Sequence, residues 1–480
     1  MSTDGLTQDF QSKMSSNSKS PTAQKGTLLE GPLWPEGDPR PSWWIENQKS
    51  AWTRFQEAPM PRRKDEDWRF ANISALHLDN FLLAPEPDAS ARKELLSFSK
   101  TGFETSGLAV FANDCLIEHQ SISDELAKQG VIWEPISVAL EKHPELLQKH
   151  FMSQLVSLGS QKFAALHQAY CKNGMLVYVP KNVEVKFPLA AFHWLCGANA
   201  SVFPHTLILA EANSKVTVLD FLHSFSDESG FACSVNDLIL GQGAQVSYLC
   251  SQNWSEKVLS FQVNATTVER DASAKSLNVN LGGFFARVES KSQLKGDAAR
   301  SEMLSMTVAH GVQEFDQRTL QNHVGKNTWS DLLYKNALSH RSKTIFKGLI
   351  QVERGASQTD AYQTNRNLLL DSEAEADSMP GLEILDDDVK CSHGATTGQI
   401  QEEELFYFLA RGITATQAKQ LLVYGFLNEV LQRFGHDEVA KEVLNKIEAK
   451  FARGKNLEWK KSVLPESNLS DETDVRALQG

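Results

Sequence analysis

The sequence has few cysteines, and no two of them form a C-x-x-C pair. They are scattered through a chain of 480 residues, at Cys115, Cys171, Cys196, Cys233, Cys250 and Cys391. This spacing matches neither the framework of a disulfide-rich secreted domain nor a zinc-finger pattern. We therefore expect a protein of a reducing compartment, the cytoplasm.

The sequence also lacks long apolar runs and a basic cluster. No stretch approaches the ~18 apolar residues that a membrane-spanning helix needs. The first 27 residues contain neither an apolar segment nor arginine, as a targeting signal would require. The net charge is −12, with lysine and arginine interleaved among acids, which argues against a nucleic-acid-binding surface. We expect no membrane and no nucleic-acid partner.

Motifs for nucleotide binding and hydrolysis are absent as well. The sequence contains no G-x-x-x-x-G-K-[ST] loop, no strand-linked G-x-G-x-x-G, no H-E-x-x-H and no G-x-S-x-G. Any step that needs a nucleotide must therefore use a site on another protein.

What the sequence does contain is a clear change of periodicity along the chain. Apolar residues first recur three to four apart, as in "SWWIENQKSAWTRFQ", then alternate in short runs such as "SKVTVLDFL", and finally return to the helical period. The predicted divisions are a disordered tail (1–39), an N-terminal helical domain (40–170), a β-rich core (171–397), a C-terminal helical domain (398–457) and a flexible acidic tail (458–480).

A phrase recurs within the β-rich core, in which a small residue leaves a turn and alternating apolar positions follow. Its centres are separated by 30, 30, 25, 29 and 29 residues, at Ser214, Ala244, Ala274, Ala299, Thr328 and Ser357. A near-constant period of short strands is what a solenoid requires, because each coil buries its inward face against its neighbours. The repeat favours a β-helix over a jelly roll or sandwich, with helical segments covering its ends.

The C-terminal helices have clear end signals. Thr414 and Gln417 form a capping box, and glycines follow the helical runs. The middle helix carries one apolar stripe, which either packs on the core or contacts a partner protein. Its members are Leu421, Leu422, Phe426, Val430, Leu431 and Phe434.

The most unusual polar pair is Cys391 and His393, in the alternating segment "LEILDDDVKCSH". In a strand, residues i and i+2 project from one face about 6 to 7 Å apart. That separation is too long for a thiolate–imidazole hydrogen bond, which weakens a nucleophile pair, but it suits two ligands of one metal or cluster. Because two ligands leave a site half complete, the other half would come from a second protein. The alternative is a structural strand end.

An acidic run precedes this pair. Eight carboxylates lie between residues 371 and 388 (Asp371, Glu373, Glu375, Asp377, Glu383, Asp386, Asp387 and Asp388). They could hold iron in transit, but a solvated or edge-protecting charged face is the commoner role of such a run.

Four segments resemble the SufB/SufD family of iron–sulfur cluster assembly proteins. The most specific is "PGLEILDDDVKCSHGATTGQIQEEELFYFLARGI", and it is accompanied in the expected order by "PRRKDEDWRF", "KTIFKGLIQVERGASQTDAYQTNRNLLL" and "ATQAKQLLVYGFLNEVL". The resemblance covers most of residues 40–450 and is to the SufD branch.

The resemblance implies a mainly β fold, in which a right-handed parallel β-helix is flanked by N-terminal and C-terminal helical domains. It also implies pairing with SufB through the β-helices and docking of a SufC ATPase on the C-terminal helices, with Leu422, Phe426 and Val430 as docking residues. Cys391 and His393 would then share a nascent iron–sulfur or iron site with SufB, and no cluster would be bound stably by this chain alone.

Two departures from SufB-like chains support that branch. SufB-like chains carry the sulfur-accepting cysteine where this chain has Asn365, and a glutamate where it has Gly394. The implied role is a non-catalytic scaffold subunit of a SufBCD complex, with a homodimer also conceivable. The alternatives are a stand-alone β-helix enzyme, such as a polysaccharide lyase or a Cys/His hydrolase, and a β-helical interaction scaffold without a metal.

Overall fold

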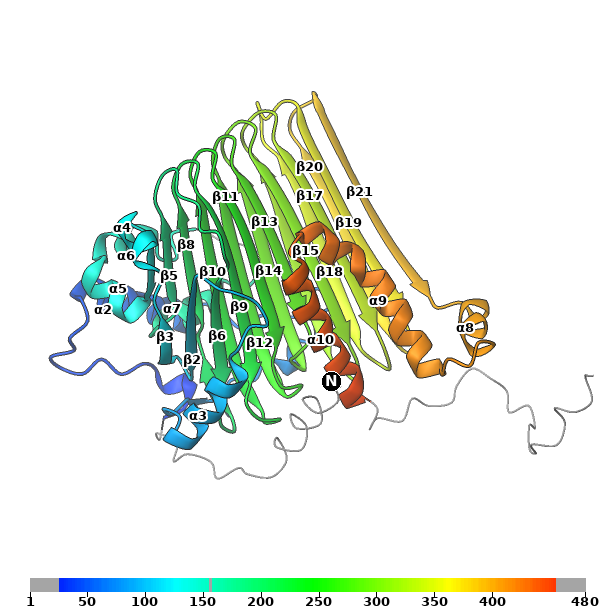
Figure 1. Cartoon of the computed structure of the whole chain (residues 1–480), viewed down its shortest axis with the longest axis horizontal. Helices are drawn as coiled ribbons and strands as arrows, with labels where there is room; N and C mark the ends of the chain where they lie inside the picture. Colours follow the sequence, from blue (N-terminus) through cyan, green and yellow to red (C-terminus); the bar gives the residue numbers. More distant parts are fainter. Residues whose placement is uncertain (1–25, 155–157, 455–480) are drawn as a thin grey trace, which may run out of the picture.

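The computed structural model describes residues 26–154 and 158–454, and a parallel β-helix occupies its centre (Figure 1). Successive strands alternate between two sheets, so that each coil contributes one strand to each. The mainly β fold with helices at both ends, predicted from the repeat and the resemblance, is confirmed.

The first sheet has the spatial order β20 (Glu375–Ile384), β18 (Lys343–Val352), β16 (Glu314–His323), β14 (Phe285–Leu294), β12 (Val258–Val268), β10 (Gly230–Leu240), β8 (His205–Ala210), β5 (Met175–Val179) and β4 (Ile132–Pro135). The short strands β1 (Leu82–Leu83) and β7 (Ala200–Val202) join at its side. Pairing is parallel from β5 to β20 and antiparallel between β4 and β5.

The second sheet has the order β21 (Val389–Gln399), β19 (Thr359–Leu369), β17 (Trp329–Leu338), β15 (Arg300–Ala309), β13 (Ser273–Asn280), β11 (Gln245–Asn253), β9 (Lys215–Ser224), β6 (Leu189–Leu195), β2 (Gly107–Ala112) and β3 (Cys115–Gln120). All pairs from β2 to β21 are parallel, and only β2 with β3 is antiparallel.

The repeat has a structural cause at one corner of each coil. There, a residue in the left-handed region, with φ between 54° and 67°, precedes a small buried residue that leads into the next strand of the second sheet. Asparagine, aspartate and glycine tolerate that conformation best, and they supply four of the six corners. The left-handed residues are Asn213, Gly243, Asp271, Ala298, Asn327 and Gln358.

The register corrects two of the predicted repeat centres. The residues that stack in one column are Ser214, Ala244, Ala272, Ala299, Thr328 and Thr359. Ala274 and Ser357 each lie two residues from this column. Ala272 and Thr359 take their places because they directly follow the left-handed residues Asp271 and Gln358. The irregular step of 25 residues therefore disappears.

The N-terminal region is not purely helical as predicted for 40–170. It contains α2 (Ser42–Glu57), α3 (Ala89–Phe98), α4 (Asp124–Lys128), α5 (Ile136–Lys142), α6 (Pro144–His150) and α7 (Gln161–Tyr170), with 3-10 turns at Leu28–Glu30, Glu66–Trp68 and Ile73–Ala75. However, β2, β3 and β4 extend both sheets of the β-helix. These strands are only four to six residues long, as in "GLAVFA". β2 and β4 form because later strands of the β-helix offer an edge to pair with.

Part of the predicted disordered tail is also ordered. Residues 1–25 lie outside the described residues, but Leu28 is fully buried, and its carbonyl accepts a 2.6 Å hydrogen bond from the Tyr170 hydroxyl. The region from 26 to 39 therefore belongs to the folded body. The predicted acidic tail, 458–480, lies outside the described residues.

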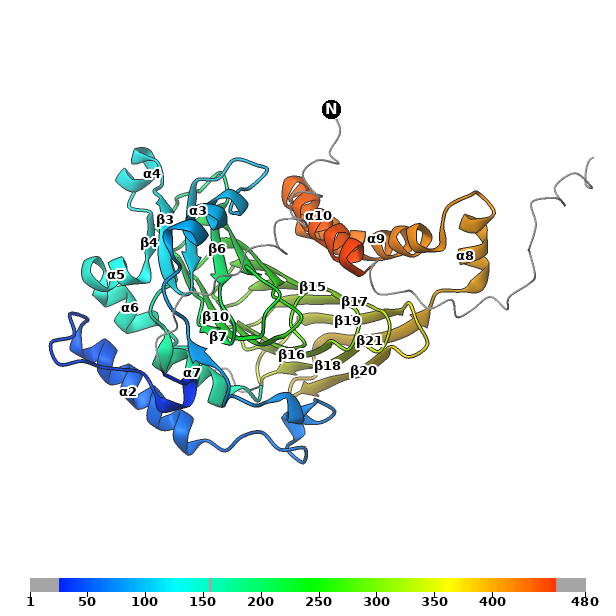
Figure 2. The ribbon, with the colours of Figure 1, turned by 90° about the horizontal axis from the view of Figure 1, so that it is seen from below.

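The C-terminal helices are α8 (Glu402–Leu409), α9 (Ala415–Phe434) and α10 (Asp437–Gly454). The predicted capping box is present, since the Thr414 hydroxyl accepts from the Gln417 amide. The α9–α10 hairpin folds back along the second sheet, over β13, β15 and β17, while α8 projects from the body (Figures 1 and 2). Among the described residues, no helix has the length and apolarity to cross a membrane.

Candidate functional site

The last coil of the β-helix is open. β20 and β21 are the terminal strands of their sheets, and no further coil or helix covers them among the described residues. Leu382 and Ile384 of β20 stack on the buried residues Ile350 and Val352, yet they remain 38% and 40% exposed. This end therefore presents core-facing apolar side chains beside two unpaired strand edges. Another protein can bind such a surface by adding strands to the edges and covering the apolar side chains.

Cys391 and His393 both lie in β21, as the alternation predicted. Cys391 pairs with Ala361 of β19, and His393 pairs with Gln363. Because Ala361 and Gln363 are buried in the interior of the preceding coil, the pair stands on the inward face of an uncovered layer. Cys391 is half-buried and His393 is exposed. Two donors about 6 to 7 Å apart on this face are accessible to a second protein.

The local electrostatics keep Cys391 protonated in the free chain. Partial burial, followed by the negative charge of Asp360, raises the pKa of its thiol. A thiol must lose its proton to bind a metal or to attack a sulfur atom. A cation or a partner protein at this end would therefore have to stabilise the thiolate form of Cys391.

Asn365 lies on β19, in the layer beneath Cys391 and His393, and Gly394 lies on β21 next to His393. Asn365 is fully buried, and its side-chain oxygen accepts from Asn367 at 3.0 Å and from Ser378 at 2.6 Å. Beneath His393, the side-chain amide of Gln363 is buried with neither polar atom bonded to another described residue. The interior below the half site is thus lined by amides and hydroxyls and contains no cysteine at position 365.

The acidic run is largely engaged in structure. Lys343 pairs with Glu375 at 3.3 Å and Asp377 at 3.0 Å, and Lys419 pairs with Asp371 at 3.2 Å. Asp386 accepts from the backbone of Gly355 and thereby holds a turn. No three carboxylates of the run converge as a metal-binding group among the described residues.

The stripe predicted on α9 matches the buried face at Val430, Leu431 and Phe434, but its first half lies one position or more away from that face. The residues packed on the body are Ala418, Val423, Leu427, Val430, Leu431 and Phe434. Of the predicted docking residues, Val430 is fully buried, whereas Leu422 and Phe426 are half-buried. Lys335 lies over the Phe426 ring at 4.9 Å. Val430 is therefore a core residue of this chain while α9 rests on the sheet.

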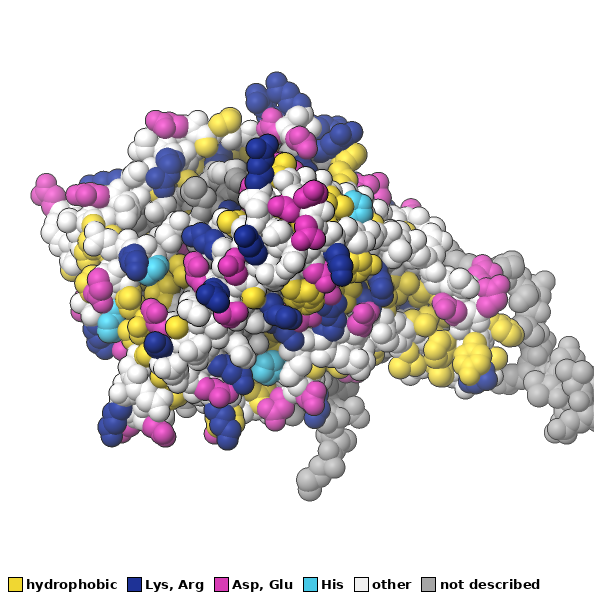
Figure 3. Space-filling view, turned by 90° about the horizontal axis from the view of Figure 1, so that it is seen from above, with side chains coloured by type: hydrophobic (Ala, Val, Ile, Leu, Met, Phe, Trp, Pro, Cys, Tyr) yellow, Lys and Arg dark blue, Asp and Glu magenta, His cyan; other side chains and the backbone are white. Residues whose placement is uncertain are grey.

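An apolar surface instead extends over α8 and the start of α9. Phe406 is 70% exposed, Tyr407 55% and Leu421 47%. The Arg411 guanidinium lies 3.5 Å from the Tyr407 ring centroid. Figure 3 shows hydrophobic side chains gathered toward the right of the molecule, on the part where α8 projects in Figure 1. We call Phe406, Tyr407 and Leu421 the α8 patch. Of these residues the sequence analysis singled out only Leu421, as part of the stripe on the middle helix.

The α9–α10 hairpin is fastened to the sheet by ion pairs. Arg433 contacts Glu302 of β15 at 2.6 Å and Asp331 of β17 at 2.7 Å. Lys335 contacts Glu429 at 2.6 Å. These pairs connect the helices next to the α8 patch directly with the middle coils of the β-helix.

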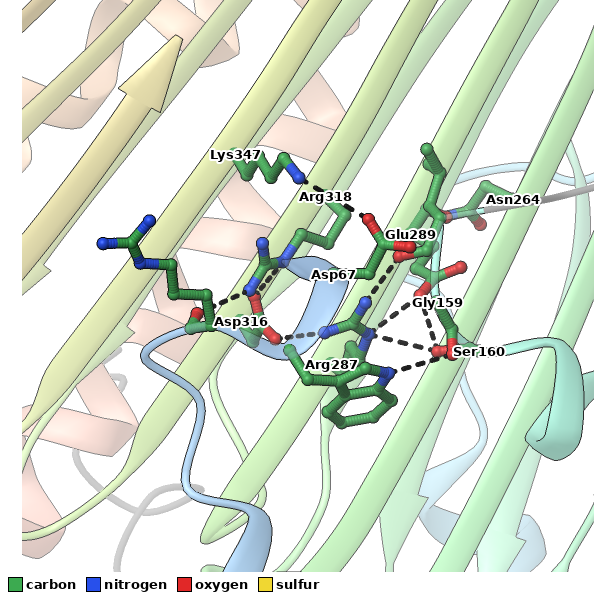
Figure 4. A network of polar contacts seen from close by, with 12 residues as sticks. Asp67, Gly159, Ser160, Asn264, Arg287, Glu289, Asp316, Arg318 and Lys347 are labelled. Atoms are coloured by element: carbon green, nitrogen blue, oxygen red, sulfur yellow. Dashed lines mark hydrogen bonds and ion pairs between the residues drawn. The ribbon is translucent and has the colours of Figure 1, made fainter. Parts of the chain in front are cut away.

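The segment "PRRKDEDWRF" fastens the N-terminal region to the first sheet. Arg287 of β14 and Arg318 of β16 both bind Asp316, and Arg287 also binds Glu289 at 2.8 Å (Figure 4). The Trp68 ring stacks on the Arg287 guanidinium and so joins this buried network. Lys347 of β18 forms an ion pair with Asp67 at 3.5 Å. The charged segment therefore holds the N-terminal region on the first sheet.

Sequence reasoning also assigned no role to His205 and Cys171. Together with His167 they form a buried cluster between α7 and β8. The i, i+4 spacing of His167 and Cys171 was visible in the sequence, but the arrival of His205 from a separate strand was not.

Comparisons with known families agree with this architecture. Residues 42–190 match the model of the SufBD protein N-terminal region, and residues 193–426 match that of the SufBD core domain of the SUF system for FeS cluster assembly. The chain is 30% identical over 416 residues to the iron-sulfur cluster assembly protein SufD of Bacillus subtilis, which covers 85% of this chain and 94% of that protein. It is 26% identical over 401 residues to an iron-sulfur cluster assembly SufBD family protein of Staphylococcus aureus, at 81% and 85% coverage.

Proposed function

The chain belongs to the SufBD family of the SUF system of iron–sulfur cluster assembly, and from that membership we propose that it is a scaffold subunit without a catalytic centre. In this role it pairs with SufB through the open end of its β-helix and docks a SufC ATPase on its C-terminal helices, in the cytoplasm. ATP hydrolysis belongs to SufC, in keeping with the absence of a nucleotide-binding motif.

The observation that carries the proposal is the uncovered last coil. Core-facing Leu382 and Ile384 are exposed there, and Cys391 and His393 stand on the same inward layer. A second β-helix placed end to end would bury the apolar residues and satisfy the strand edges. It would also bring its own ligands to the two donors of this chain.

His393 is the group we propose as a ligand of the nascent cluster or of iron. It is exposed on the free chain, and a neutral imidazole donates readily to iron. Cys391 is the second donor; partial burial raises the pKa of its thiol, so binding of a cation must displace the thiol proton. Neither donor completes a site without the partner, so the iron is cargo rather than a resident cofactor.

The SufC surface we propose is the α8 patch, continued by the half-buried Leu422 and Phe426. Three large apolar side chains exposed together on one projecting helix and its neighbour are typical of a docking surface. Val430 contributes by holding α9 on the sheet, unless docking lifts the hairpin and exposes it. Because Arg433 and Lys335 form ion pairs between the hairpin and the sheet, movement of the hairpin would displace side chains on β15 and β17.

The decisive experiment is co-expression with SufB and SufC, followed by anaerobic purification, absorption spectroscopy and iron and sulfide analysis. His393→Ala should leave the complex assembled while cluster content falls about tenfold, because one ligand is lost. Ser392→Ala is the matched control, since Ser392 is exposed on the opposite face of the same strand. Unchanged iron in the His393→Ala complex would sink the site assignment.

The same end could pair with a second copy of this chain. Light scattering of the purified chain with and without SufB distinguishes these outcomes. A homodimer that SufB cannot dissociate would contradict the heterodimer proposed here.

A further inference from the structure

A group of metal-ligating side chains lies between α7 and the early coils, near the end of the β-helix opposite to Cys391 and His393. It consists of His167 from α7, Cys171 just after α7, and His205 at the start of β8. One donor atom from each lies within 4.8 Å of the other two, and all three side chains are fully buried. Within residues 26–154 and 158–454, it is the one such group of three donors.

The spacing of the two imidazoles is close to that of ligands on one ion. His167 Nε2 lies 3.1 Å from His205 Nδ1. Two nitrogens bound to a tetrahedral Zn²⁺ at 2.0 to 2.1 Å are about 3.3 Å apart. A shift of a few tenths of an ångström would therefore convert the contact into a pair of metal bonds.

The surrounding hydrogen bonds orient the rings for this role. His167 Nδ1 lies 2.7 Å from the Cys233 carbonyl, which can only accept, so this nitrogen carries the proton and Nε2 presents its lone pair. His205 Nε2 lies 3.8 Å from Asp237 Oδ2. An imidazole backed by a carbonyl or a carboxylate is the usual arrangement around a metal site.

Without an ion, these contacts conflict. For His205 Nδ1 to donate to His167 Nε2, His205 must keep Nε2 unprotonated, and that lone pair then faces the Asp237 carboxylate. His205 Nε2 indeed has no hydrogen-bond partner among the described residues. Protonating both nitrogens would bury a charged imidazolium, which is costly. A cation between the rings lets His205 carry its proton on Nε2, pointing at Asp237.

The backbone holds the third donor in place. The Asn173 side-chain oxygen accepts from the backbone amides of Ser137 and Gly174, which fixes the turn after Cys171. Gly174 has φ +152°, and a Cβ there would lie 2.0 Å from the His205 carbonyl oxygen. The turn can therefore approach β8 this closely only with glycine at 174, and this approach brings the Cys171 sulfur to the imidazoles.

We propose that His167, Cys171 and His205 bind a structural transition-metal ion, with Zn²⁺ as the best-matched species, that joins α7 to β8. One thiolate and two imidazoles suit Zn²⁺ better than Ca²⁺ or Mg²⁺. The Asn173 carbonyl, 3.6 Å from Cys171 Sγ, is within reach as a fourth ligand. Binding releases the thiol proton of Cys171. The site is buried and separate from the proposed cluster half site, so it serves stability rather than transfer.

The test uses the full-length chain carrying Cys391→Ser and His393→Ala, so that the open end offers no competing donors. The chain is purified without added metal and then titrated with Co²⁺ as the probe. We expect about one equivalent to bind with a thiolate-to-cobalt charge-transfer band, to be displaced by Zn²⁺, and to raise the melting temperature. Cys171→Ser should lower cobalt affinity at least tenfold and remove that band.

Cys196→Ser is the matched control, because Cys196 is equally buried and free but outside the cluster. It should bind Co²⁺ as the parent chain does. If Cys171→Ser does not fold, X-ray absorption of the zinc-loaded parent chain decides, with one sulfur and two imidazoles expected around the ion. An ion without a sulfur ligand, or a parent chain that binds no Co²⁺ or Zn²⁺, overturns the proposal.

Discussion

The guanidinium of Arg287 stacks on the indole of Trp68, 3.9 Å from the ring centroid. Arg287 belongs to β14 and Trp68 to the N-terminal segment, so one contact joins regions more than 200 residues apart in the sequence. The arginine is fully buried with Glu289 and Asp316. The charge network is therefore the link between the N-terminal segment and the middle of the first sheet.

Replacement of Arg287 should be strongly destabilising. Arg287→Met leaves two buried carboxylates short of a counter-charge, and we expect a loss of about 3 to 5 kcal/mol in the free energy of unfolding, measured in urea. Arg270→Met removes a comparable pair with Asp271 at an exposed position and should cost less than about 1 kcal/mol. Equal effects of the two variants would contradict the anchoring role.

The α8 patch should decide docking of SufC. Phe406→Ser combined with Tyr407→Ser removes most of the exposed apolar area while leaving the buried face of α9 intact. We expect pull-down of SufC to be lost and pairing with SufB to be retained. Glu403→Gln, on the same helix, is the control. Retained SufC binding by the double variant would place docking elsewhere, as would retained binding after truncation at residue 398.

Arg433 should control how firmly the hairpin rests on the β-helix. Arg433→Gln breaks partly buried pairs with Glu302 and Asp331, so we expect faster hydrogen exchange in α9 and α10. Arg366→Gln removes a more exposed contact with Glu429 and should leave exchange almost unchanged. The assay is exchange followed by mass spectrometry. Similar protection in both variants would refute this coupling.

Asp220 should make stability depend on pH. Burial raises its pKa from 3.8 to about 6, although Tyr248 and Thr206 donate to one of its oxygens. Between these values the folded state holds the proton and the unfolded state does not, so stability falls as the pH rises, by roughly 3 kcal/mol across the window.

Asp220→Asn removes this titration. We expect the variant to gain up to about 2 kcal/mol over the parent chain at pH 7.5 and to show no gain at pH 4, in urea unfolding at both values. A gain that is the same at both pH values would mean that the carboxyl does not titrate in this range.

Elements of the fold could be predicted from the sequence where the residues that determine them are neighbours in the chain. The β-helix could be predicted because each corner carries its own signal, a left-handed residue followed by a small buried one. β2 and β4 could not, because six and four residues show no period of their own and become strands only against the coils that follow. Burial of Leu28 likewise depends on Tyr170, which lies 142 residues later.

The functional residues were likewise predictable only where neighbouring residues in the chain determine their positions. Cys391 and His393 share a face because they alternate within one strand, which the sequence displays directly. Only the first half of the buried face of α9 was mispredicted, because Leu421, Leu422, Val423, Phe426 and Leu427 make the helix apolar on more than half of its circumference there. Only the shape of the sheet beneath decides which of these residues is covered.

The order of the coils along the chain also determines the order in which they can fold during translation. Each coil pairs with the one made just before it, so a chain leaving the ribosome can add layers one at a time onto structure already formed. The layer that holds Cys391 and His393 is the last to be laid down, and the helices that bear the α8 patch emerge only after it. A prematurely terminated chain would therefore lack both features, so any interaction at either of them requires a chain that has been translated almost completely.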